Sequence, residues 1–294
     1  MRILFVSSNR IGDAVLSTGL LDHLLRSYPA ARFTVACGPA AAGVFARLPR
    51  LERLIVFDKR PHGRHWLTLW RQVVGTRWEW VVDIRGSALG WLVRTRHRVA
   101  MRNTTGHKVG QLAAVLHLAP PPLPVTWTAP EDGARAAALL GADRWIALGP
   151  TANTDLKIWP AQRFIDLSRA LAAEGPLKGA RAVILGGPDA RERPLAQPVI
   201  DALPGCLDLC GKLSLPEAAA VLARCALFVG NDSGLMHLAA AAGVPPLGVF
   251  GPTPWREYSP AGRRTAVAVS PTGRMADLTV AAALEATRPL LEAR

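Results

Sequence analysis

The sequence predicts an α/β protein of two tandem domains with a cleft between them, each domain built on a doubly wound parallel sheet. Three observations lead to this class. The chain has 294 residues, which is enough for two domains of about 150 residues each. Short apolar runs alternate with segments of helical periodicity, as in parallel sheets covered by helices. This alternation stops at a proline-rich segment, residues 120–124, and then restarts.

In the first domain, apolar runs predict buried strands at residues 2–7, 32–36, 53–57 and 80–84. Leucines at helical spacing predict a helix that follows residues 9–13 and ends at Pro29, and small residues predict another over 39–48. We expect this domain to span residues 1–142, with a linker at about 119–130 and a short helix at 133–141.

In the second domain, residues 143–294, the same reasoning predicts strands at 145–148, 182–185, 227–229 and 247–250. Helices are expected at 160–174, 215–224, 235–242 and about 277–292. The last of these packs either on its own domain or back on the first. Ligands of such folds bind beyond the carboxyl ends of the strands, so the loops that follow the strands are the candidates for chemistry.

Composition excludes several classes of protein. Half of the residues are hydrophobic and only 19% are charged, which excludes intrinsic disorder. The apolar opening is shorter than a signal peptide requires, and no run approaches the roughly 20 apolar residues of a membrane span. The four cysteines predict neither a disulfide framework nor a zinc site. We therefore expect a soluble, cytoplasmic protein that binds no metal.

Positive charge is concentrated in the first half of the chain. The net charge is +13, and residues 1–150 hold 20 Lys and Arg against 9 Asp and Glu. No acid occurs between Asp83 and Glu131, whereas six basic residues do: Arg85, Arg94, Arg96, Arg98, Arg102 and Lys108. Such an excess indicates an anionic partner, which could be nucleic acid, anionic lipid or a phosphorylated substrate. A solvated basic face is the simpler interpretation.

The loop after the first expected strand, residues 9–13, contains a single glycine and ends in Asp13. It therefore lacks the G-x-G-x-x-G pattern of dinucleotide-binding proteins, and no Walker A motif occurs in the chain. Asp13 has two interpretations: a helix N-cap, or a carboxylate that takes a proton from a hydroxyl group.

Two loops of the second domain have the chemistry of a phosphate site. Residues 149–160 offer Thr151, Asn153 and Lys157, whose donors suit phosphate oxygens. Residues 229–237 pass from a strand into a helix through small residues, so the N–H groups at the helix start can bind an anion. The simpler alternatives are a polar loop with a solvated lysine, and a capped helix with a buried His237.

A set of motifs resembles those of the lipopolysaccharide heptosyltransferases, glycosyltransferase family 9. The resemblance covers nearly the whole chain and is densest in the second half. The motifs occur in order and at suitable spacing: Ile11-Gly12-Asp13, Lys157-Ile158-Trp159-Pro160, Gly186-Gly187-Pro188, Gly211-Lys212-Leu213-Ser214-Leu215, Asn231-Asp232-Ser233-Gly234-Leu235-Met236-His237 and Phe250-Gly251-Pro252-Thr253.

The resemblance implies two Rossmann-like domains of the GT-B type, with the acceptor bound by the first and a nucleotide sugar by the second. It implies an inverting transferase that needs no metal or cofactor and moves a heptose from an ADP-sugar to a lipid A–core acceptor. Asp13 would be the general base, and Lys157 would stabilise the leaving diphosphate. The implied donor site consists of Thr151, Asn153, Lys157, Gly187, Asp232, Ser233, Gly234, His237, Gly251 and Thr253. The implied acceptor site consists of Asn9, Arg10, Gly12, Arg85, Arg94, Arg96 and Arg98.

The chemistry of the loops agrees with these roles. A diphosphate that leaves without Mg²⁺ needs fixed positive charge and oriented N–H groups, which Lys157 and the helix start at Ser233-Gly234 offer. The basic first domain would bind an anionic glycolipid and touch an anionic membrane surface at the cytoplasmic face of the inner membrane. One departure concerns the donor's ribose: the position that is acidic in some relatives is Ala190, with Asp189 and Glu192 beside it.

Other functions remain open at this point. A transferase of the same fold could use another nucleotide sugar for an O-antigen, capsule or protein acceptor. A nucleic-acid-binding protein would need an aromatic platform or recognition helix near the charge, for which Trp91 beside Arg94 is the only candidate; no nucleic-acid partner is expected. An inactive scaffold of the same family is disfavoured by the presence of Asp13 and Lys157.

Overall fold

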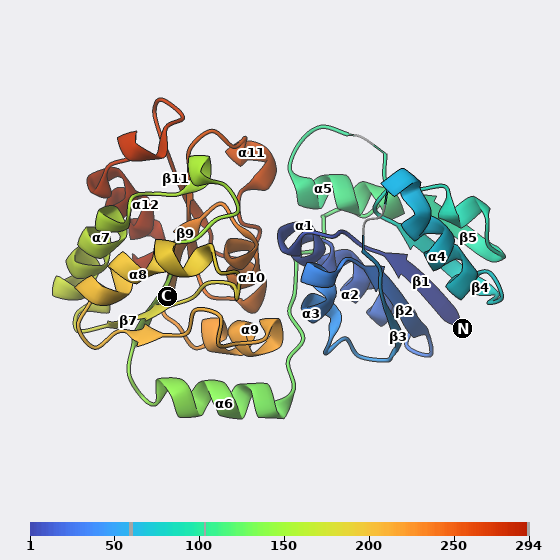
Figure 1. The fold of residues 1–294 in the computed structure, drawn as a ribbon, viewed down its shortest axis with the longest axis horizontal. Coiled ribbons are helices and arrows are strands. Elements are labelled where there is room, and N and C mark those ends of the chain that lie inside the picture. Colours follow the sequence, from blue (N-terminus) through green and yellow to red (C-terminus); the bar gives the residue numbers. More distant parts are fainter. Residues whose placement is uncertain (59–60, 103, 293–294) are drawn as a thin grey trace. The chain divides into compact units, whose positions relative to one another are not determined.

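The computed structural model describes residues 1–58, 61–102 and 104–292, and the chain forms two compact units, Met1–Trp127 and Thr128–Arg294 (Figure 1). The boundary falls within the expected linker, before the expected start of the second domain at residue 143. The reason is that helix α6 (Pro130–Leu140) packs on α9 (Leu215–Ala223) of the second unit. Arg135 of α6 also forms an ion pair with Glu217 of α9, with 2.9 Å between Nε and Oε1.

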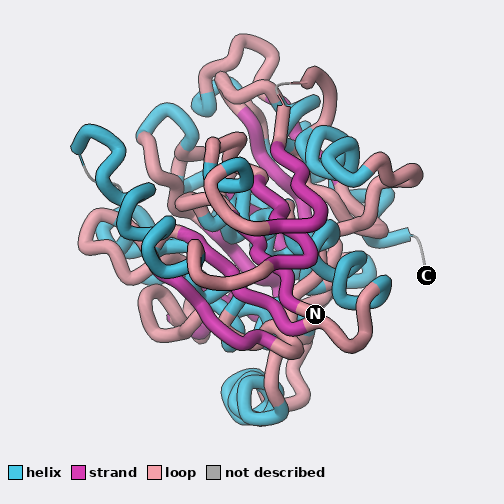
Figure 2. The backbone as a smooth tube through the Cα atoms, turned by 90° about the vertical axis from the view of Figure 1, so that its right-hand side faces the viewer, coloured by secondary structure: helices cyan, strands magenta, loops and turns pink. Residues whose placement is uncertain are grey.

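The first unit contains a parallel sheet with the strand order β3-β2-β1-β4-β5. Figure 2 shows its strands side by side, with helices on both sides. The strands are β1 (Arg2–Val6), β2 (Arg32–Cys37), β3 (Leu51–Val56), β4 (Trp78–Asp83) and β5 (Thr95–Ala100). The sequence patterns did not predict β5. It is an edge strand with a largely exposed, charged sequence, so no apolar run marks it.

The helices of the first unit are shorter than the leucine pattern predicts. The single helix expected after Asp13 is two helices that meet at Ser17, whose hydroxyl donates to the carbonyl of Ala14 at 2.7 Å. The expected helix at 39–48 consists of a 3₁₀ turn, Pro39–Ala41, and one helical turn. The α-helices are α1 (Ile11–Leu16), α2 (Thr18–Ser27), α3 (Ala42–Phe45), α4 (Arg64–Val73) and α5 (Lys108–Ala113).

One face of the first sheet is covered by α4 and by the 3₁₀ turn η3 (Leu89–Trp91). Leu69 and Val73 of α4 and Leu89 of η3 pack in one buried cluster with Leu4 and Val81 of the central strands. This packing fixes the position of the chain between β4 and β5.

The second unit contains a six-stranded parallel sheet with the order β11-β10-β9-β6-β7-β8. Its strands are β6 (Trp145–Gly149), β7 (Arg181–Ile184), β8 (Leu207–Asp208), β9 (Leu227–Asn231), β10 (Pro246–Phe250) and β11 (Ala266–Val269). The remaining helices are α7 (Ala161–Ala173), α8 (Glu192–Ala202), α10 (Gly234–Ala242), α11 (Trp255–Tyr258) and α12 (Val280–Glu292). Within its own unit, α12 packs on α7, β10 and β11.

Both sheets reverse their strand order at the first strand of the unit. In the first unit, β1 lies between β2 and β4, and in the second, β6 lies between β7 and β9. The loops that leave the two central strands run to opposite faces of the sheet, which opens a crevice at the carboxyl edge where ligands of such folds bind. In the first unit, this crevice is therefore flanked by the loops after β1 and β4. In the second unit, it is flanked by the loops after β6 and β9.

Among the described residues, no helix is long and apolar enough to span a bilayer.

Candidate functional site

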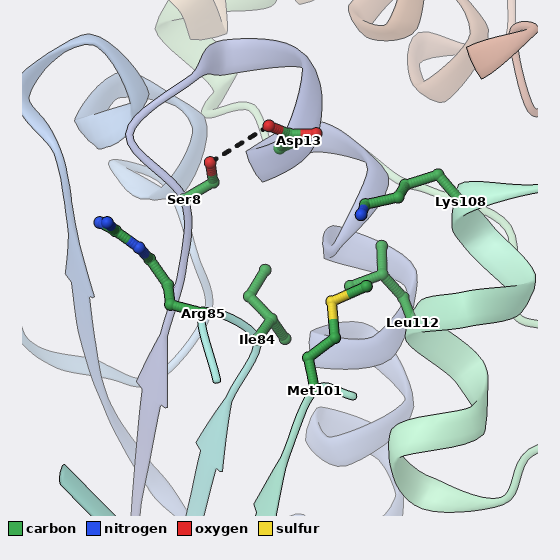
Figure 3. Close-up of a pocket in the computed structure, with 7 residues that line it drawn as sticks. All are labelled: Ser8, Asp13, Ile84, Arg85, Met101, Lys108 and Leu112. Atoms are coloured by element: carbon green, nitrogen blue, oxygen red, sulfur yellow. Dashed lines mark hydrogen bonds between the residues drawn. The ribbon is translucent and has the colours of Figure 1, made fainter. Parts of the chain in front are cut away.

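The first unit has a small pocket of about 110 Å³ at its strand-order reversal (Figure 3). Its walls come from the loops that follow β1, β4 and β5 and from helices α1 and α5, so segments distant in sequence meet at one sheet edge. The lining residues are Ser8, Asp13, Ile84, Arg85, Met101, Lys108 and Leu112.

Asp13 is the one acid in the lining of this pocket. It is the third residue of α1, whose N-cap is Arg10, so the N-cap interpretation of Asp13 is wrong. Its Oδ2 accepts a long hydrogen bond of 3.4 Å from the Ser8 hydroxyl (Figure 3). A half-buried carboxylate with one weak partner, at the edge of a pocket, can accept a proton from a bound hydroxyl group.

Arg85 enters the same pocket from the loop after β4. Its Nη1 donates to Oδ1 of Asn9 at 2.7 Å, which ties that loop to the loop after β1. The buried carboxylate of Asp83 shapes the turn, because it accepts the backbone N–H groups of Arg85 at 2.8 Å and Ser87 at 2.9 Å. Burial raises the pKa of Asp83 despite these hydrogen bonds.

Lys108 belongs to this pocket, although the sequence analysis counted it only among the basic residues. It is the first residue of α5, and its side chain points into the pocket (Figure 3). Its Nζ lies 3.4 Å from Oε1 of Gln111. The available signal was its place as the last basic residue of the acid-free stretch. Since α5 was not expected, nothing connected Lys108 to Asp13.

The structure does not bring the three arginines Arg94, Arg96 and Arg98 to this pocket. They lie just before and along β5, and only the carboxyl end of that strand reaches the pocket, through Met101. At about 3.3 Å per residue, Arg94 is about 20 Å from Met101 along the strand. Of the other expected acceptor residues, Arg10 and Gly12 lie at the start of α1, beside the pocket lining.

In the second unit, the expected donor residues follow the carboxyl ends of four neighbouring strands. Thr151, Asn153 and Lys157 follow β6, Gly187 follows β7, Asp232, Ser233, Gly234 and His237 follow β9, and Gly251 and Thr253 follow β10. Asn153 is exposed, Thr253 is half-buried and Thr151 and His237 are buried. The residues thus share one sheet edge.

An ion pair joins the two loops at the strand-order reversal. Nζ of Lys157 lies 2.6 Å from Oδ2 of Asp232, whose side chain is only 8% exposed, against 27% for the lysine. The lysine is therefore held in one place and keeps part of its ammonium open to solvent. The sequence analysis assigned Asp232 to the donor site, but it did not identify it as the partner of Lys157.

The residues around this ion pair are rigidly held. The fully buried Trp159 donates its backbone N–H to Oδ1 of Asn231 at 2.9 Å and its indole N–H to the carbonyl of Leu278 at 2.9 Å. Lys157 and Asp232 are each within two residues of these anchors, so their relative position depends on the core.

Helix α10 starts beside Asp232 with its first N–H groups open. Ser233 is its N-cap residue, and its side chain makes no capping hydrogen bond. The first-turn N–H groups of a helix have no partner within the helix and carry its positive dipole end. Together with the ammonium of Lys157, they form a set of donors suited to an anion such as a phosphate.

Glu192 is a residue of this edge that the sequence analysis noted but did not assign to the site. Its Oε2 accepts the hydroxyl of Thr151 and the backbone N–H of Gly187, each at 2.6 Å. A Cβ at Gly187 would lie 2.7 Å from Oε1 of Glu192, so a larger residue there would displace the glutamate side chain. Glu192 opens helix α8, which was not expected, and this explains why its role was missed.

Among the described residues, no three His, Cys, Asp or Glu side chains are grouped so that they could hold a metal ion.

Comparisons with known proteins agree with this architecture. The family model described as glycosyltransferase family 9 (heptosyltransferase) matches residues 73–286. A 132-residue stretch is 36% identical to lipooligosaccharide heptosyltransferase 2 of Haemophilus influenzae, covering 43% of this chain and 36% of that protein, or about a third of its length.

Two solved structures share the fold over nearly the whole chain. The glycosyl transferase family 9 structure from Veillonella parvula has a TM-score of 0.82 at 20% identity and covers 99% of this chain and 97% of its own. E. coli heptosyltransferase WaaC with ADP has a TM-score of 0.76 at 21% identity and covers 99% of this chain and 100% of its own. With a family model that matches most of its length, and with the two-domain parallel-sheet fold of these structures, the chain belongs to glycosyltransferase family 9, the heptosyltransferases.

Proposed function

We propose that this protein transfers a heptose from an ADP-sugar to an anionic acceptor of the lipopolysaccharide core, with inversion at the anomeric carbon and without a metal ion. The acceptor would be bound by the first unit and the nucleotide sugar by the second. The observation that carries the proposal is the Lys157–Asp232 pair at the open start of α10, at the strand-order reversal of a family 9 chain.

The diphosphate of the donor is the group that suits this place. A leaving diphosphate gains negative charge in the transition state, and preorganised donors stabilise it where that charge develops. Lys157 would supply the charge, and the N–H groups of Ser233 and Gly234 would supply oriented dipoles. Asp232 would act as a positioning residue, because its carboxylate holds the ammonium and would repel a phosphate placed on it. The relative crystallised with ADP supports the choice of nucleotide.

Asp13 would act as the general base. In a single displacement, the acceptor hydroxyl oxygen bonds to the anomeric carbon while the bond from that carbon to the diphosphate oxygen breaks. The hydroxyl proton passes to the carboxylate of Asp13, and ADP leaves with the electron pair of the broken bond. Inversion follows from this single displacement, because the hydroxyl oxygen attacks from the face opposite to the leaving diphosphate.

Lys108 and Arg85 suit an anionic acceptor, since both line the pocket that contains Asp13. Carboxylate or phosphate groups of the acceptor would pair with them and bring the hydroxyl group to Asp13. Such glycolipid acceptors are anchored in a bilayer. We therefore place the protein in the cytoplasm, in peripheral contact with the anionic inner face of the inner membrane.

The test is nucleotide binding followed by transfer. Thermal unfolding of the purified protein is measured with ADP, UDP, GDP or CDP in the presence of EDTA, for the unsubstituted chain and for Lys157→Ala. We expect ADP to stabilise the protein selectively and the lysine variant to lose most of that stabilisation. Transfer from ADP-heptose to a lipid A–core acceptor then follows, with the product's anomeric configuration determined by NMR.

The results separate the alternatives. Selective stabilisation by UDP or GDP would mean that the donor is a different nucleotide sugar, and the roles proposed for Asp13 and Lys157 would stay the same. A requirement for Mg²⁺ or a retained anomeric configuration would contradict the mechanism. If no nucleotide stabilised the protein, the assignment of the donor site to the second unit would be contradicted.

A further inference from the structure

An apolar groove of about 650 Å³ lies between helix α4 and the segment between β4 and β5. Its wall residue Trp66 has its ring centre 5.3 Å from the guanidinium carbon of Arg85, which also lines the Asp13 pocket. Its apolar walls are Trp66, Leu67 and Trp70 of α4, and Leu89 and Leu92 at η3. Its two walls are joined by a hydrogen bond of 2.9 Å from the indole N–H of Trp70 to the carbonyl of Leu92. The groove is thus a formed feature of the first unit.

Large apolar side chains stand exposed along this groove. Leu67 is 49% exposed, Leu92 60% and Trp91 72%. Single exposed leucines are ordinary, but three large apolar side chains beside an apolar groove mark a surface that contacts another apolar phase.

Arginines surround the same groove. Val81 pairs with Leu4 and with Arg98 in the sheet register, so Arg98 lies on the sheet face that α4 and η3 cover, and Arg96, two residues earlier, shares it. The guanidinium of Arg98 lies 4.6 Å from the ring centre of Trp91. On α4, Arg64 and Arg71 flank Leu67 at helical spacing, and both are exposed.

Few acids lie in this stretch of the chain. Residues 61–130 contain nine Lys and Arg and two acids. One of these acids, Asp83, is buried, and the other, Glu79, pairs with Arg96 at 3.3 Å. Apolar side chains with a tryptophan at the tip and a rim of arginines match the boundary between the headgroups and acyl chains of an anionic bilayer.

We propose that this surface, which we call the α4–η3 surface (Trp66, Leu67, Trp70, Leu89, Trp91 and Leu92 with Arg64, Arg71, Arg94, Arg96 and Arg98), inserts into an anionic lipid bilayer. Trp91 and Leu92 reach the acyl region, the groove seats a lipid acyl chain, and the arginines pair with lipid phosphates. This proposal deepens the proposed function and rests on it, because a glycolipid acceptor anchored in a bilayer requires the protein to bind a membrane.

Charge argues against a second copy of this chain as the occupant. A two-fold contact would bring the same arginine rim face to face with itself, and like charges brought together at an interface cost binding energy. An anionic bilayer instead releases counterions and gains attraction from each arginine at its surface.

The first experiment measures binding of the full chain to vesicles of phosphatidylcholine with or without 30% phosphatidylglycerol, by co-sedimentation at about 0.1 M salt. We expect binding only with the anionic lipid, and about a hundredfold weaker binding for Arg94→Gln/Arg96→Gln/Arg98→Gln. The matched control removes three exposed arginines of the second unit, Arg224, Arg263 and Arg288, and should change binding less than threefold. Trp91→Ala/Leu92→Ala should weaken binding at least tenfold, whereas Leu123→Ala, at an exposed leucine elsewhere, should not.

The second experiment measures how deeply Trp91 inserts into the bilayer. Phosphatidylglycerol with brominated acyl chains should quench part of the tryptophan fluorescence of the unsubstituted chain. Trp91→Phe should lose the share of that quenching that comes from Trp91, while it keeps its binding within threefold. Binding that requires the arginines but shows no Trp91-dependent quenching would overturn insertion in favour of charge attraction alone. A dimer in the absence of lipid that Trp91→Ala converts to a monomer would overturn the bilayer as the occupant.

ADP stabilisation of each variant separates this proposal from the proposed function. Variants that lose vesicle binding and keep stabilisation by ADP support the α4–η3 surface as an independent site. If the chain bound vesicles normally but bound no nucleotide, the proposed function would be rejected and the membrane-binding role of the α4–η3 surface would still be supported.

Discussion

Asp13 and Lys157 differ in how firmly the structure holds them. Lys157 forms a 2.6 Å ion pair with a carboxylate that is almost fully buried, whereas Asp13 has one hydrogen bond of 3.4 Å from Ser8. A group that must bind a fixed diphosphate benefits from being held, since little order is lost on binding. A general base needs a free lone pair in order to accept a proton. The weak hydrogen bond from Ser8 leaves such a lone pair on the carboxylate of Asp13.

Replacing Asp13 by Asn tests the base. The substitution keeps the shape and the acceptor for Ser8 but removes the basic oxygen, so we expect kcat to fall about 10²- to 10⁴-fold. Stabilisation by ADP should be unchanged, because no donor contact is lost. Rates are measured with saturating ADP-heptose, and Asp22→Asn, an acid of α2 paired with Arg26, is the control. Turnover within threefold of normal would remove Asp13 from the mechanism.

Replacing Lys157 by Ala tests the phosphate site. A charge-assisted hydrogen bond contributes about 1.5–3 kcal/mol, so the Kd for ADP, measured by calorimetry, should rise about tenfold or more. Lys178→Ala, an exposed lysine of the same unit, should leave it unchanged. Asp232→Asn should weaken ADP less than Lys157→Ala, because the ammonium remains and only its position is loosened. An unchanged Kd in Lys157→Ala would contradict the assignment.

The neighbourhood of β8 shows how an ion-pair cluster joins elements of the second unit. Asp208 at the end of β8 receives Arg193 of α8 at 2.6 Å and Lys212 at 2.8 Å. Partial burial raises the pKa of Asp208, but the hydrogen bonds from Lys212 and Arg193 outweigh it and lower the pKa to about 2, from an ordinary 3.8. The ionised carboxylate therefore stabilises the folded state.

This shift predicts a dependence on pH. A pKa that is lower in the folded state contributes stability above the unfolded value of 3.8, and this contribution is lost as the pH falls towards 2. Because the two cations are about half exposed, the contribution is about 1 kcal/mol, below the full value of the shift. Asp208→Asn should lower the melting temperature at pH 6, and its deficit should shrink between pH 4 and pH 3. A deficit that stays constant over this range would contradict the ion-pair account.

The arginines at and just before β5 show that the function predicted from a charge pattern depends on the element that carries it. As part of an acid-free stretch, Arg94, Arg96 and Arg98 predict an anion-binding region, which the family resemblance assigns to the acceptor site. On an exposed edge strand, the same arginines also prevent pairing with another sheet. Their position beside the α4–η3 groove then changes the proposed anion from a substrate group to a lipid phosphate.

Taken as a whole, the molecule consists of two units that each have their own sheet, core and strand-order reversal. Ligand binding confined to one unit should therefore stabilise that unit first. At 100 times Kd, a ligand stabilises the state that binds it by about 2.7 kcal/mol.

Hydrogen exchange with ADP present tests this independence. We expect ADP to slow exchange of backbone amides at residues 149–160, 186–192 and 230–237 by tenfold or more, and to leave the strands of the first unit unchanged. Mass spectrometry of peptides from the full chain gives the measurement, and Lys157→Ala serves as the control that loses the effect. Equal protection in both units would mean that ADP contacts or orders both of them.

Much of this protein was predictable from sequence because its central strands are buried on both faces. Such strands are continuous apolar runs, so β1, β2, β4, β6, β7, β9 and β10 were all predicted within a few residues. Parallel strands also send the loops after them to one edge, so the expected donor residues that follow β6, β7, β9 and β10 could be placed at one sheet edge. Both inferences need only local patterns and the direction of the chain.

The tertiary structure alone decided the partners of the charged residues. Lys157 and Asp232 are 75 positions apart, and Thr151 and Glu192 are 41 apart, so no local pattern connects them. Strand β5 and helix α4 were missed because their exposed faces carry arginines and tryptophans where a buried element would carry aliphatic residues. Whether an arginine lies at the Asp13 pocket or beside an apolar groove depends on strand order and register, which arise from packing between segments distant in sequence.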